Sequence, residues 1–191
     1  MKELSLHILD IVQNSIKAEA TLIEIIIIED LKKDLLTIEI TDNGKGMNKD
    51  LLKKATDPFV TTRVTRRVGL GLSLLKATAQ QCEGNMLVES EEGMGTKIHT
   101  TFQHSHIDRA PLGSMVDTLI TLLIESEEES GEVKNERTVD YIYKHQVNDQ
   151  SFIFDTREVK KILEGTPIND LAVLEWIKDY LKENLERLVK S

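Results

Sequence analysis

The chain has 191 residues, a mass of 21.7 kDa and 40% hydrophobic residues, which suits one globular domain with an extension or two small domains. Its net charge of -9 and pI of about 5.1 argue against a surface for nucleic acid or for anionic membranes. The lone Cys82 excludes an internal disulfide, and polar residues interrupt positions 1–20 as they would not in a signal peptide. No apolar run is long enough to span a bilayer, so we expect a soluble, cytoplasmic protein.

Residues 4–16 are predicted to form a helix, because apolar residues recur there at helical spacing. These apolar residues are Leu4, Ile8, Val12 and Ile16. Beside them His7, Asp10 and Asn14 form a polar stripe, with Asp10 and Asn14 four residues apart on one face. Short Asp and Asn side chains next to an apolar face favour the docking of a polar ligand. The alternative is that both residues only cap or solvate a surface helix.

Two predicted strands follow and lead into the sequence DNGKGM, residues 42–47. Residues 21–28 (TLIEIIII) are almost continuously apolar and predict a strand that is covered on both faces. Residues 36–40 alternate and predict a half-buried strand that ends at Asp42, where a carboxylate is well placed to meet a ligand. Gly44 and Gly46 allow close approach of the backbone, although a tight turn would use the same residues.

The next segment combines a short helix, a basic cluster and a glycine pair. Asn48 can cap a helix that runs to about Lys54, and DPFVTTR (57–63) interrupts regular structure. Arg63, Arg66 and Arg67 form a basic cluster that fits phosphate groups. GLGLS (69–73) then opens an apolar helical pattern to Thr78. A glycine-rich helix start offers free N–H groups and binds phosphate, the alternative being a glycine pair used only for packing.

A strand at 86–88, the block GMGT (93–96) and a strand at 97–102 complete this part of the chain. His104, His106 and Asp108 alternate, and a continued strand would place them on one face as metal ligands. We do not favour that alternative, because no fourth ligand is evident in the sequence.

Together and in this order, these blocks resemble the GHKL superfamily of ATP-binding domains, which includes histidine kinases, anti-sigma-factor kinases, DNA gyrase B subunits, MutL proteins and large heat-shock chaperones. The resemblance covers roughly the first hundred residues. It implies a two-layer α/β sandwich (the Bergerat-type fold), with helices on one face of a mixed sheet and ATP between the helices and a lid at 60–68. The family's usual opening strand and helix have no counterpart before residues 4–16, so another segment must cover that sheet edge.

The resemblance also implies roles for individual residues. Asn14 matches the family's magnesium ligand, and Asp10 matches the catalytic acidic position, where most members have Glu. Asp42 matches the acceptor of the adenine amino group. Further nucleotide-binding positions are Gly44, Gly46, Met47, Phe59, Thr62, Arg63, Gly69, Leu70, Gly71, Leu72 and Thr96. Arg67 departs from the histidine kinases, which often carry an additional Gly there.

We place a boundary near Pro111 and Gly113, which divides the chain into an ATP-binding domain at 1–110 and a C-terminal α+β extension at 111–191. The extension is predicted as α-β-β-α-α. Its elements are a helix capped by Ser114 and running through Leu123, an acidic linker around 125–129, a hairpin of 139–147 and 151–154, a helix capped by Asp155 or Thr156, and a last helix capped by Asn169 or Asp170. We expect this extension to pack on the first domain or to bind a partner.

Two functions are compatible with these residues. In the first, the protein uses ATP and Mg²⁺ to hydrolyse ATP or to phosphorylate a protein partner. In the second, it is a nucleotide-sensing regulator whose partner binding depends on ATP. A sensor kinase within this one chain is less favoured, because His7 is the only candidate phosphoacceptor on the site face and a structural role suits it better. A homodimer is compatible with the sequence.

Overall fold

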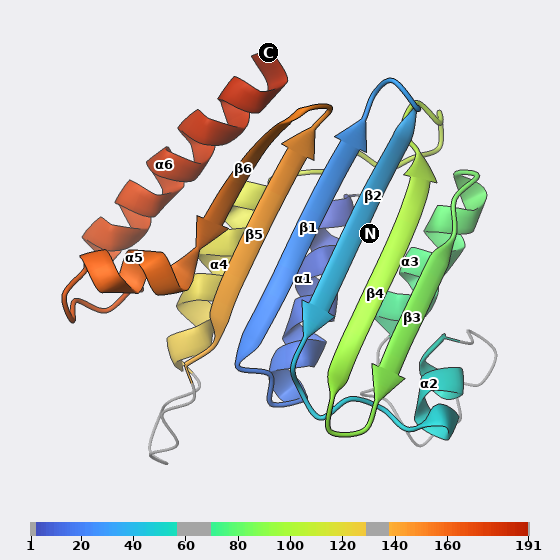
Figure 1. Cartoon of the computed structure of the whole chain (residues 1–191), viewed down its shortest axis with the longest axis horizontal. Coiled ribbons are helices and arrows are strands. Elements are labelled where there is room, and N and C mark those ends of the chain that lie inside the picture. The colour runs from blue at the N-terminus through green and yellow to red at the C-terminus, as the bar shows by residue number, and fades with distance from the viewer. Residues whose placement is uncertain (1–2, 57–69, 129–137, 191) are drawn as a thin grey trace.

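The computed structural model describes residues 3–56, 70–128 and 138–190. Six strands form one mixed sheet in the order β3-β4-β2-β1-β5-β6, and the helices α1, α3 and α4 cover one of its faces (Figure 1). In chain order the elements are α1 (Leu4–Lys17), β1 (Leu22–Asp30), β2 (Leu35–Asp42), α2 (Lys49–Thr56), α3 (Leu70–Gln81), β3 (Met86–Glu91), β4 (Gly95–Gln103), α4 (Met115–Glu128), β5 (Asp140–Val147), β6 (Gln150–Asp155), α5 (Thr156–Ile162) and α6 (Leu171–Lys190). The predicted two-layer α/β sandwich with its α-β-β-α-α extension is confirmed.

The extension continues the sheet of the first hundred residues. β5 pairs with β1 in parallel, with Ile23 opposite Tyr141, and all other neighbouring strands are antiparallel. β5 therefore covers the edge of β1, for which the sequence predicted a covering segment without identifying it. A crossover through α4 makes this parallel pairing possible, as parallel strands require a long connection.

The prediction that residues 21–28 are covered on both faces is wrong. Ile23, Ile25 and Ile27 are fully buried under the helices, whereas Ile26 and its neighbours on the other face are only half-buried. In the sheet register Ile26 lies between Glu39 and Lys144, and long polar side chains can shield an isoleucine with their aliphatic stems. An apolar run thus belongs to a sheet whose second face carries no helix among the described residues (Figure 1).

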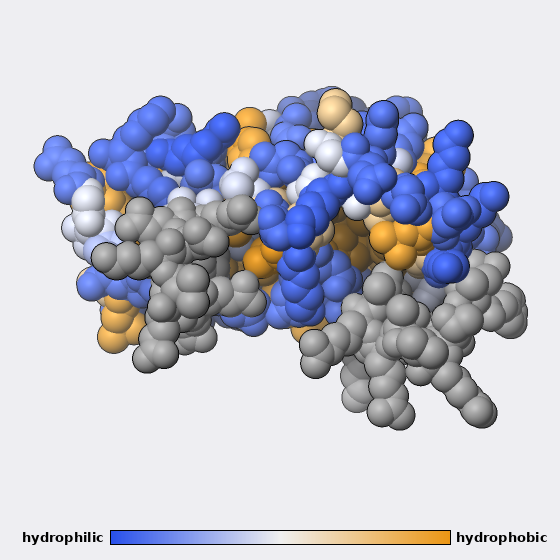
Figure 2. Space-filling model, turned by 90° about the horizontal axis from the view of Figure 1, so that it is seen from below, coloured by the Kyte–Doolittle hydropathy of each residue, from blue (hydrophilic) through white to orange (hydrophobic). Residues whose placement is uncertain are grey.

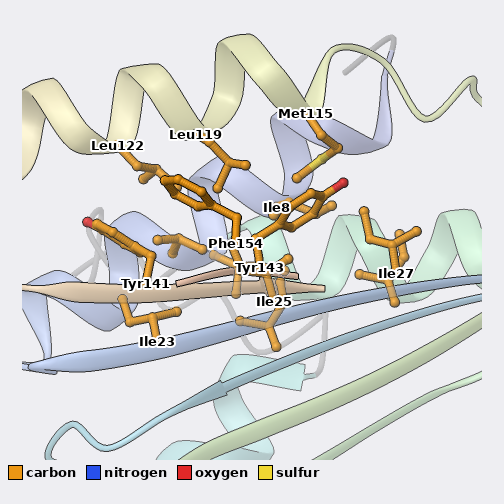
Figure 3. Packing of buried hydrophobic residues seen from close by; sticks show 14 of the residues in the cluster. Ile8, Ile23, Ile25, Ile27, Met115, Leu119, Leu122, Tyr141, Tyr143 and Phe154 are labelled. Carbon is orange, nitrogen blue, oxygen red and sulfur yellow. The ribbon is translucent and has the colours of Figure 1, made fainter. Parts of the chain in front are cut away.

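The core lies between the sheet and the helices, and the extension contributes much of it. In Figure 3, Leu119 and Leu122 of α4 lie over Phe154 and Tyr141, next to the β1 isoleucines. Phe102 and Tyr143 are also fully buried. Because hydrophobic stabilisation scales with the apolar area removed from water, α4, β5 and β6 stabilise β1 directly.

A partly buried polar network joins the extension to the other strands. Glu29, at the end of β1, accepts hydrogen bonds from Nε2 of His145 in β5 and from Nε2 of His104, each at 2.8 Å. The Tyr143 hydroxyl lies 2.8 Å from Nδ1 of His145. These histidine contacts hold the pKa of Glu29 down at about 2, and burial raises the pKa of Tyr143. We call Glu29, His104, Tyr143 and His145 the β1–β5 polar network.

The same network argues against a metal site at His104, His106 and Asp108. β4 ends at Gln103, so these residues do not continue a strand, and His104 instead contacts Glu29. In the described parts of the chain no group of three His, Cys, Asp or Glu residues could hold a metal ion. Nor does any helix among the described residues have the length and apolarity needed to cross a membrane.

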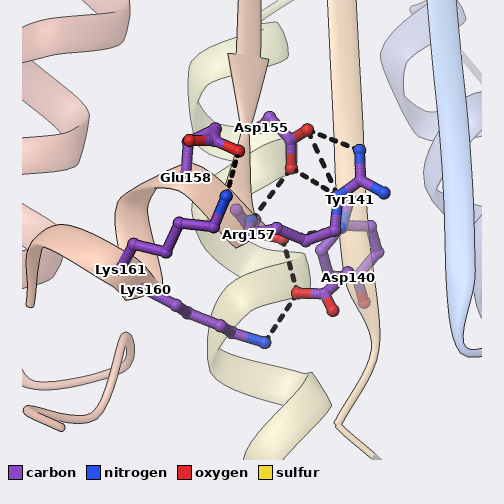
Figure 4. Close-up of polar contacts among 8 residues, drawn as sticks. Asp140, Tyr141, Asp155, Arg157, Glu158, Lys160 and Lys161 are labelled. Atoms are coloured by element: carbon purple, nitrogen blue, oxygen red, sulfur yellow. Dashed lines mark hydrogen bonds and ion pairs between the residues drawn. The ribbon is translucent and has the colours of Figure 1, made fainter. Parts of the chain in front are cut away.

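The predicted helix caps of the extension are confirmed, but the predicted end of its first helix is not. Ser114 accepts a hydrogen bond from the Asp117 amide, but α4 continues to Glu128, so the acidic stretch before residue 129 belongs to this helix rather than to a linker. Glu125 accepts from the side-chain amide of Gln13. Asp155 caps α5 and also pairs with Arg157 (Figure 4). The cap of α6 is Asp170, whose side chain accepts from the amide of residue 172.

A second polar cluster fixes α5 against the hairpin. Thr156 donates from its hydroxyl to Asp140 Oδ1 at 2.9 Å and accepts from the backbone amide of Tyr141. Lys160 also contacts Asp140, at 2.8 Å (Figure 4). These contacts connect the start of β5 to the end of β6, so the hairpin and α5 are held as one unit.

Candidate functional site

A cavity of about 290 Å³ opens between α1, the segment that follows β2, and the start of α3. Figure 2 views the molecule from the end of the sheet at which this segment lies, and apolar side chains show there between polar ones. The lining is mainly apolar, with a few polar groups. It consists of Ile11, Asn14, Ser15, Lys17, Ala18, Asp42, Lys45, Gly46, Met47, Leu51, Ala55, Leu72, Thr96 and Ile98. A mostly apolar pocket with few convergent polar groups is typical of a small-molecule site.

Asp42 is the fixed polar group of this cavity. Its side chain is 8% exposed, and both of its oxygens receive hydrogen bonds. Ser15 of α1 donates from its hydroxyl to Oδ2 at 2.6 Å, and the backbone amide of Gly44 donates to Oδ1 at 2.9 Å. The carboxylate therefore has one orientation, and each oxygen keeps a further lone pair for a ligand.

The glycines of residues 42–47 are required by close contacts of the backbone. Gly46 has a φ of 65°, and a Cβ there would overlap the carbonyl oxygen of Glu91. The amide of Lys45 donates to the carbonyl of Ala18 at 2.8 Å, and its carbonyl accepts from the amide of Gly93 at 2.7 Å. This segment is thus clamped between the end of α1 and the β3–β4 turn.

Ser90 and Thr96 support the same segment from the sheet. Ser90 accepts from the amide of Met47 at 2.8 Å, and its hydroxyl lies 2.9 Å from that of Thr96. Thr96 stands opposite Asp42 in the register of β2 and β4. The predicted positions Asp42, Met47 and Thr96 are therefore held together around one cavity.

Asn14 and Asp10 lie on the side of α1 that faces α3. Asn14 lines the cavity and is half-buried. Asp10 does not line it, but its Oδ2 occupies the space that a side chain at Gly71 would need. The Asp10 carboxylate thus lies against the first turn of α3, where the positive end of the helix dipole favours negative charge.

The structure gathers many of the predicted site residues and leaves others outside its described part. Asn14, Asp42, Gly46, Met47, Leu72 and Thr96 line the cavity, and Gly44 and Gly71 contact residues beside it. Leu70 begins α3, but its side chain is not described. Phe59, Thr62, Arg63 and Gly69 lie outside the described residues, as do Arg66, Arg67 and the predicted lid at 60–68.

Sequence reasoning missed Ser15, Lys17 and Lys45, which also line the cavity. The signal for Ser15 was its place beside Asn14, one residue further along the same helix. Lys45 stands within the glycine-rich segment itself and forms an ion pair with Glu19. These lysines bring positive charge to the cavity of a protein whose net charge is -9.

His7 has the surroundings of a structural residue. Its side chain is 3% exposed on α1, and burial lowers its pKa below the ordinary value. It does not line the cavity.

The cavity and its sheet lie within a segment that matches a known family. Residues 2–106 match the family described as histidine kinase-, DNA gyrase B-, and HSP90-like ATPase. Sporulation kinase E of Bacillus subtilis (strain 168) is 42% identical over 74 residues, which cover 39% of this chain and 10% of that protein. The sensor kinase CckA of Brucella abortus (strain 2308) is 39% identical over 86 residues, or 42% and 9% of the two chains. The chain thus spans about a tenth of the length of these relatives.

A solved structure shares the fold. The N-terminal domain of a DNA repair protein aligns with a TM-score of 0.51 over 80% of this chain and 52% of that chain, at 16% identity. Because the family match covers more than half of the chain and contains every described residue that lines the cavity, the protein belongs to the histidine kinase-, DNA gyrase B- and HSP90-like ATPases.

Proposed function

We propose that this protein binds ATP with Mg²⁺ in the cavity at Asp42 and hydrolyses it or transfers its γ-phosphate to a protein partner. The observation that carries the proposal is the buried Asp42 carboxylate, fixed by Ser15 and Gly44. An ionised carboxylate accepts hydrogen bonds only, which suits the amino group of adenine. The cavity, at about 290 Å³, is near the lower end of the roughly 300–1,000 Å³ typical of ligand sites, and suits a purine base with the phosphates directed outward.

The few oxygen ligands near Asn14 suit a Mg²⁺ ion that is bound mainly through the phosphates of the nucleotide. The described residues hold no group of three ligands for a metal, but Asn14 offers one amide oxygen at the cavity. Mg²⁺ commonly binds through few protein oxygens and completes its shell with phosphates and water. Mg²⁺ would supply charge neutralisation to the phosphates there.

Asp10 is the proposed catalytic residue. Its carboxylate lies beside Gly71, at the helix end to which phosphates bind in proteins. A carboxylate at this position can orient or deprotonate an attacking water or hydroxyl, provided that it comes within hydrogen-bond reach. The contact with α3 also supports a second candidate, a non-catalytic sensor, in which Asp10 only stabilises the start of this helix.

Calorimetry of Asp42→Ala tests the binding site. We expect ATP and ADP to bind the wild type with Mg²⁺ and to lose most of their affinity for the variant, because the substitution removes the buried carboxylate that lines the cavity. Asp149→Ala is the matched control, since Asp149 pairs with Lys32 at the surface of a distant turn. Equal affinity of wild type and Asp42→Ala would overturn the assignment.

Asn14→Ala tests the metal. It should weaken binding in Mg²⁺ more than binding in EDTA, because the lost oxygen contacts the ion rather than the base. An equal loss in both conditions would make Asn14 a structural residue.

Asp10→Asn separates the enzyme from the sensor. It should retain ATP binding but lose most phosphate release or phosphate transfer, because loss of a positioned base typically costs about 10²- to 10⁴-fold. A wild type that binds ATP without any turnover, alone or with a partner, would favour the sensor.

A further inference from the structure

β6 is the outer strand of the sheet on the side of the extension, and it has backbone groups that no neighbouring strand bonds. Residues of β5 with even numbers turn their N–H and C=O groups to β1, as the adjacent Asn148 does when its amide donates to the Glu29 carbonyl. Ser151 and Ile153 stand opposite even-numbered residues of β5. In an antiparallel pair, two residues that stand opposite each other either bond each other with both backbone groups or both point these groups away. Because the even-numbered residues of β5 point theirs to β1, Ser151 and Ile153 point theirs outward, away from β5.

Two exposed aromatic residues of α6 lie beside this strand. Trp176 and Tyr180 are stacked, with ring centroids 5.5 Å apart, and they are 48% and 38% exposed. The ring of Tyr180 also meets Phe152 of β6 edge-on at 5.7 Å. We call Trp176 and Tyr180 the aromatic pair. Large aromatic side chains that remain half-exposed beside a strand are typical of binding surfaces.

α6 extends the helix layer beyond the last strand. Its buried residues, Ile177 among them, belong to the common core, whereas Lys178 on its other flank pairs with Asp117 of α4. In Figure 1 α6 lies on the outer side of β6. A further strand added to β6 would therefore run along α6, with alternate side chains over the aromatic pair. Its other side chains would lie beside Ile153, which is 57% exposed on the opposite face.

We propose that an extended peptide of a partner protein, with alternating basic and apolar side chains, adds to β6 as a seventh strand. Main-chain hydrogen bonds to Ser151 and Ile153 would give affinity, and the aromatic pair would select the side chains, as in other cases of strand addition. Asp179 is exposed on α6, one turn from Trp176, so its carboxylate favours a cation over the aromatic pair.

A second copy of this chain fits the same edge less well. If two β6 strands paired across a two-fold axis, each copy would bring its own α6 to the space beside the other's edge strand. A peptide without a helix of its own avoids this conflict. The proposal deepens the proposed function, because it describes the partner, but the surface lies on the extension and does not require nucleotide.

Trp176 is the only tryptophan of the chain, so its fluorescence reports directly on this surface. The experiment titrates the full chain, without nucleotide, with the seven-residue peptide RVRVRVR and with EVEVEVE as the charge control. Ile153→Pro removes an outward N–H that bonds none of the described strands, and Ile153→Val keeps it. Circular dichroism confirms that both variants retain the fold.

We expect a saturable change in Trp176 fluorescence with RVRVRVR, at least tenfold weaker binding of EVEVEVE, and at least tenfold weaker binding of RVRVRVR to Ile153→Pro than to Ile153→Val.

No response to RVRVRVR at millimolar concentration would overturn the proposal. A response that persists in Ile153→Pro would exclude strand addition, and an equal response to both peptides would exclude the basic preference. Concentration-dependent dimers in sedimentation that Ile153→Pro abolishes would show that a second copy occupies the edge. Because ATP is absent throughout, these outcomes are independent of the Asp42 variants.

Discussion

Ser15 determines the orientation of the acceptor that we propose for adenine. Its hydroxyl is buried and donates to Asp42 at 2.6 Å, and a buried hydrogen bond to a charged group contributes about 1.5–3 kcal/mol. Ser15→Ala should therefore lower the free energy of unfolding by about that amount and weaken nucleotide binding, which urea unfolding and calorimetry measure. Thr121→Ala, which removes a hydroxyl bonded to a carbonyl of its own helix, is the control. Unchanged affinity in Ser15→Ala would show that Gly44 alone suffices to orient Asp42.

Glu29 should make stability depend on pH. Its pKa falls from an ordinary 4.5 to about 2, chiefly through hydrogen bonds with His145 and His104 and against the effect of burial. A carboxyl group with a depressed pKa in the folded state stabilises the protein fully above about pH 4.5, and this stabilisation is lost as the pH falls toward 2. It amounts to about 3 kcal/mol. Unfolding measured between pH 2 and pH 6 should show a steeper acid loss in the wild type than in Glu29→Gln. Parallel curves for the two proteins would contradict this assignment.

At the scale of elements, two glycines around α3 should respond differently to alanine. A Cβ at Gly71 meets only the end of the Asp10 side chain, which can rotate, whereas a Cβ at Gly84 meets the backbone carbonyl of Thr101. Alanine also improves helix propensity by up to about 1 kcal/mol in place of Gly71. Gly71→Ala should therefore change the thermal midpoint little but displace Asp10 and reduce ATP turnover. Gly84→Ala should lower the midpoint by several degrees. A Gly71→Ala protein with wild-type turnover would separate Asp10 from catalysis.

The sequence predicts elements well where local signals decide them. Ser114 and Asp170 cap helices, and Asn48 caps α2, because short polar side chains bond exposed amides wherever a helix begins. Burial of β1 was predicted wrongly, since a continuous apolar run does not show which face another layer covers. The contact between Ser15 and Asp42 joins residues from separate elements, and a single sequence contains no local signal for it.

At the scale of the molecule, the extension completes the sheet of the ATPase segment. β5 pairs with β1 from Leu22 to Glu29, and buried residues of α4 share one core cluster with both strands. Which strand would fill that edge depends on tertiary packing and could not be predicted from the sequence. The division into two domains near residue 110 therefore stays a prediction. A truncated protein can test whether the first domain folds without the extension.

A protein that ends at residue 110 should not retain the native fold. It would lose every backbone bond between β1 and β5 and would expose Ile23, Ile25 and Ile27 to water where α4 and its neighbours now cover them. We expect poor dispersion in its amide NMR spectrum and binding of a hydrophobic dye, in contrast to the full chain. A well-dispersed spectrum that retains most full-length resonances would show that residues 1–110 fold independently.

The parallel pairing of β1 with β5 also bears on how the protein is made. Ile23 of β1 pairs with Tyr141 of β5, which is synthesised more than a hundred residues later. Until then, β1 has only β2 as a neighbouring strand. Such non-local contacts slow folding, because the entropy of closing a long loop is lost before the contacts form. On the ribosome we therefore expect the apolar strand at residues 22–30 to keep one edge unpaired until the last third of the chain emerges, and an unpaired apolar strand is prone to aggregation.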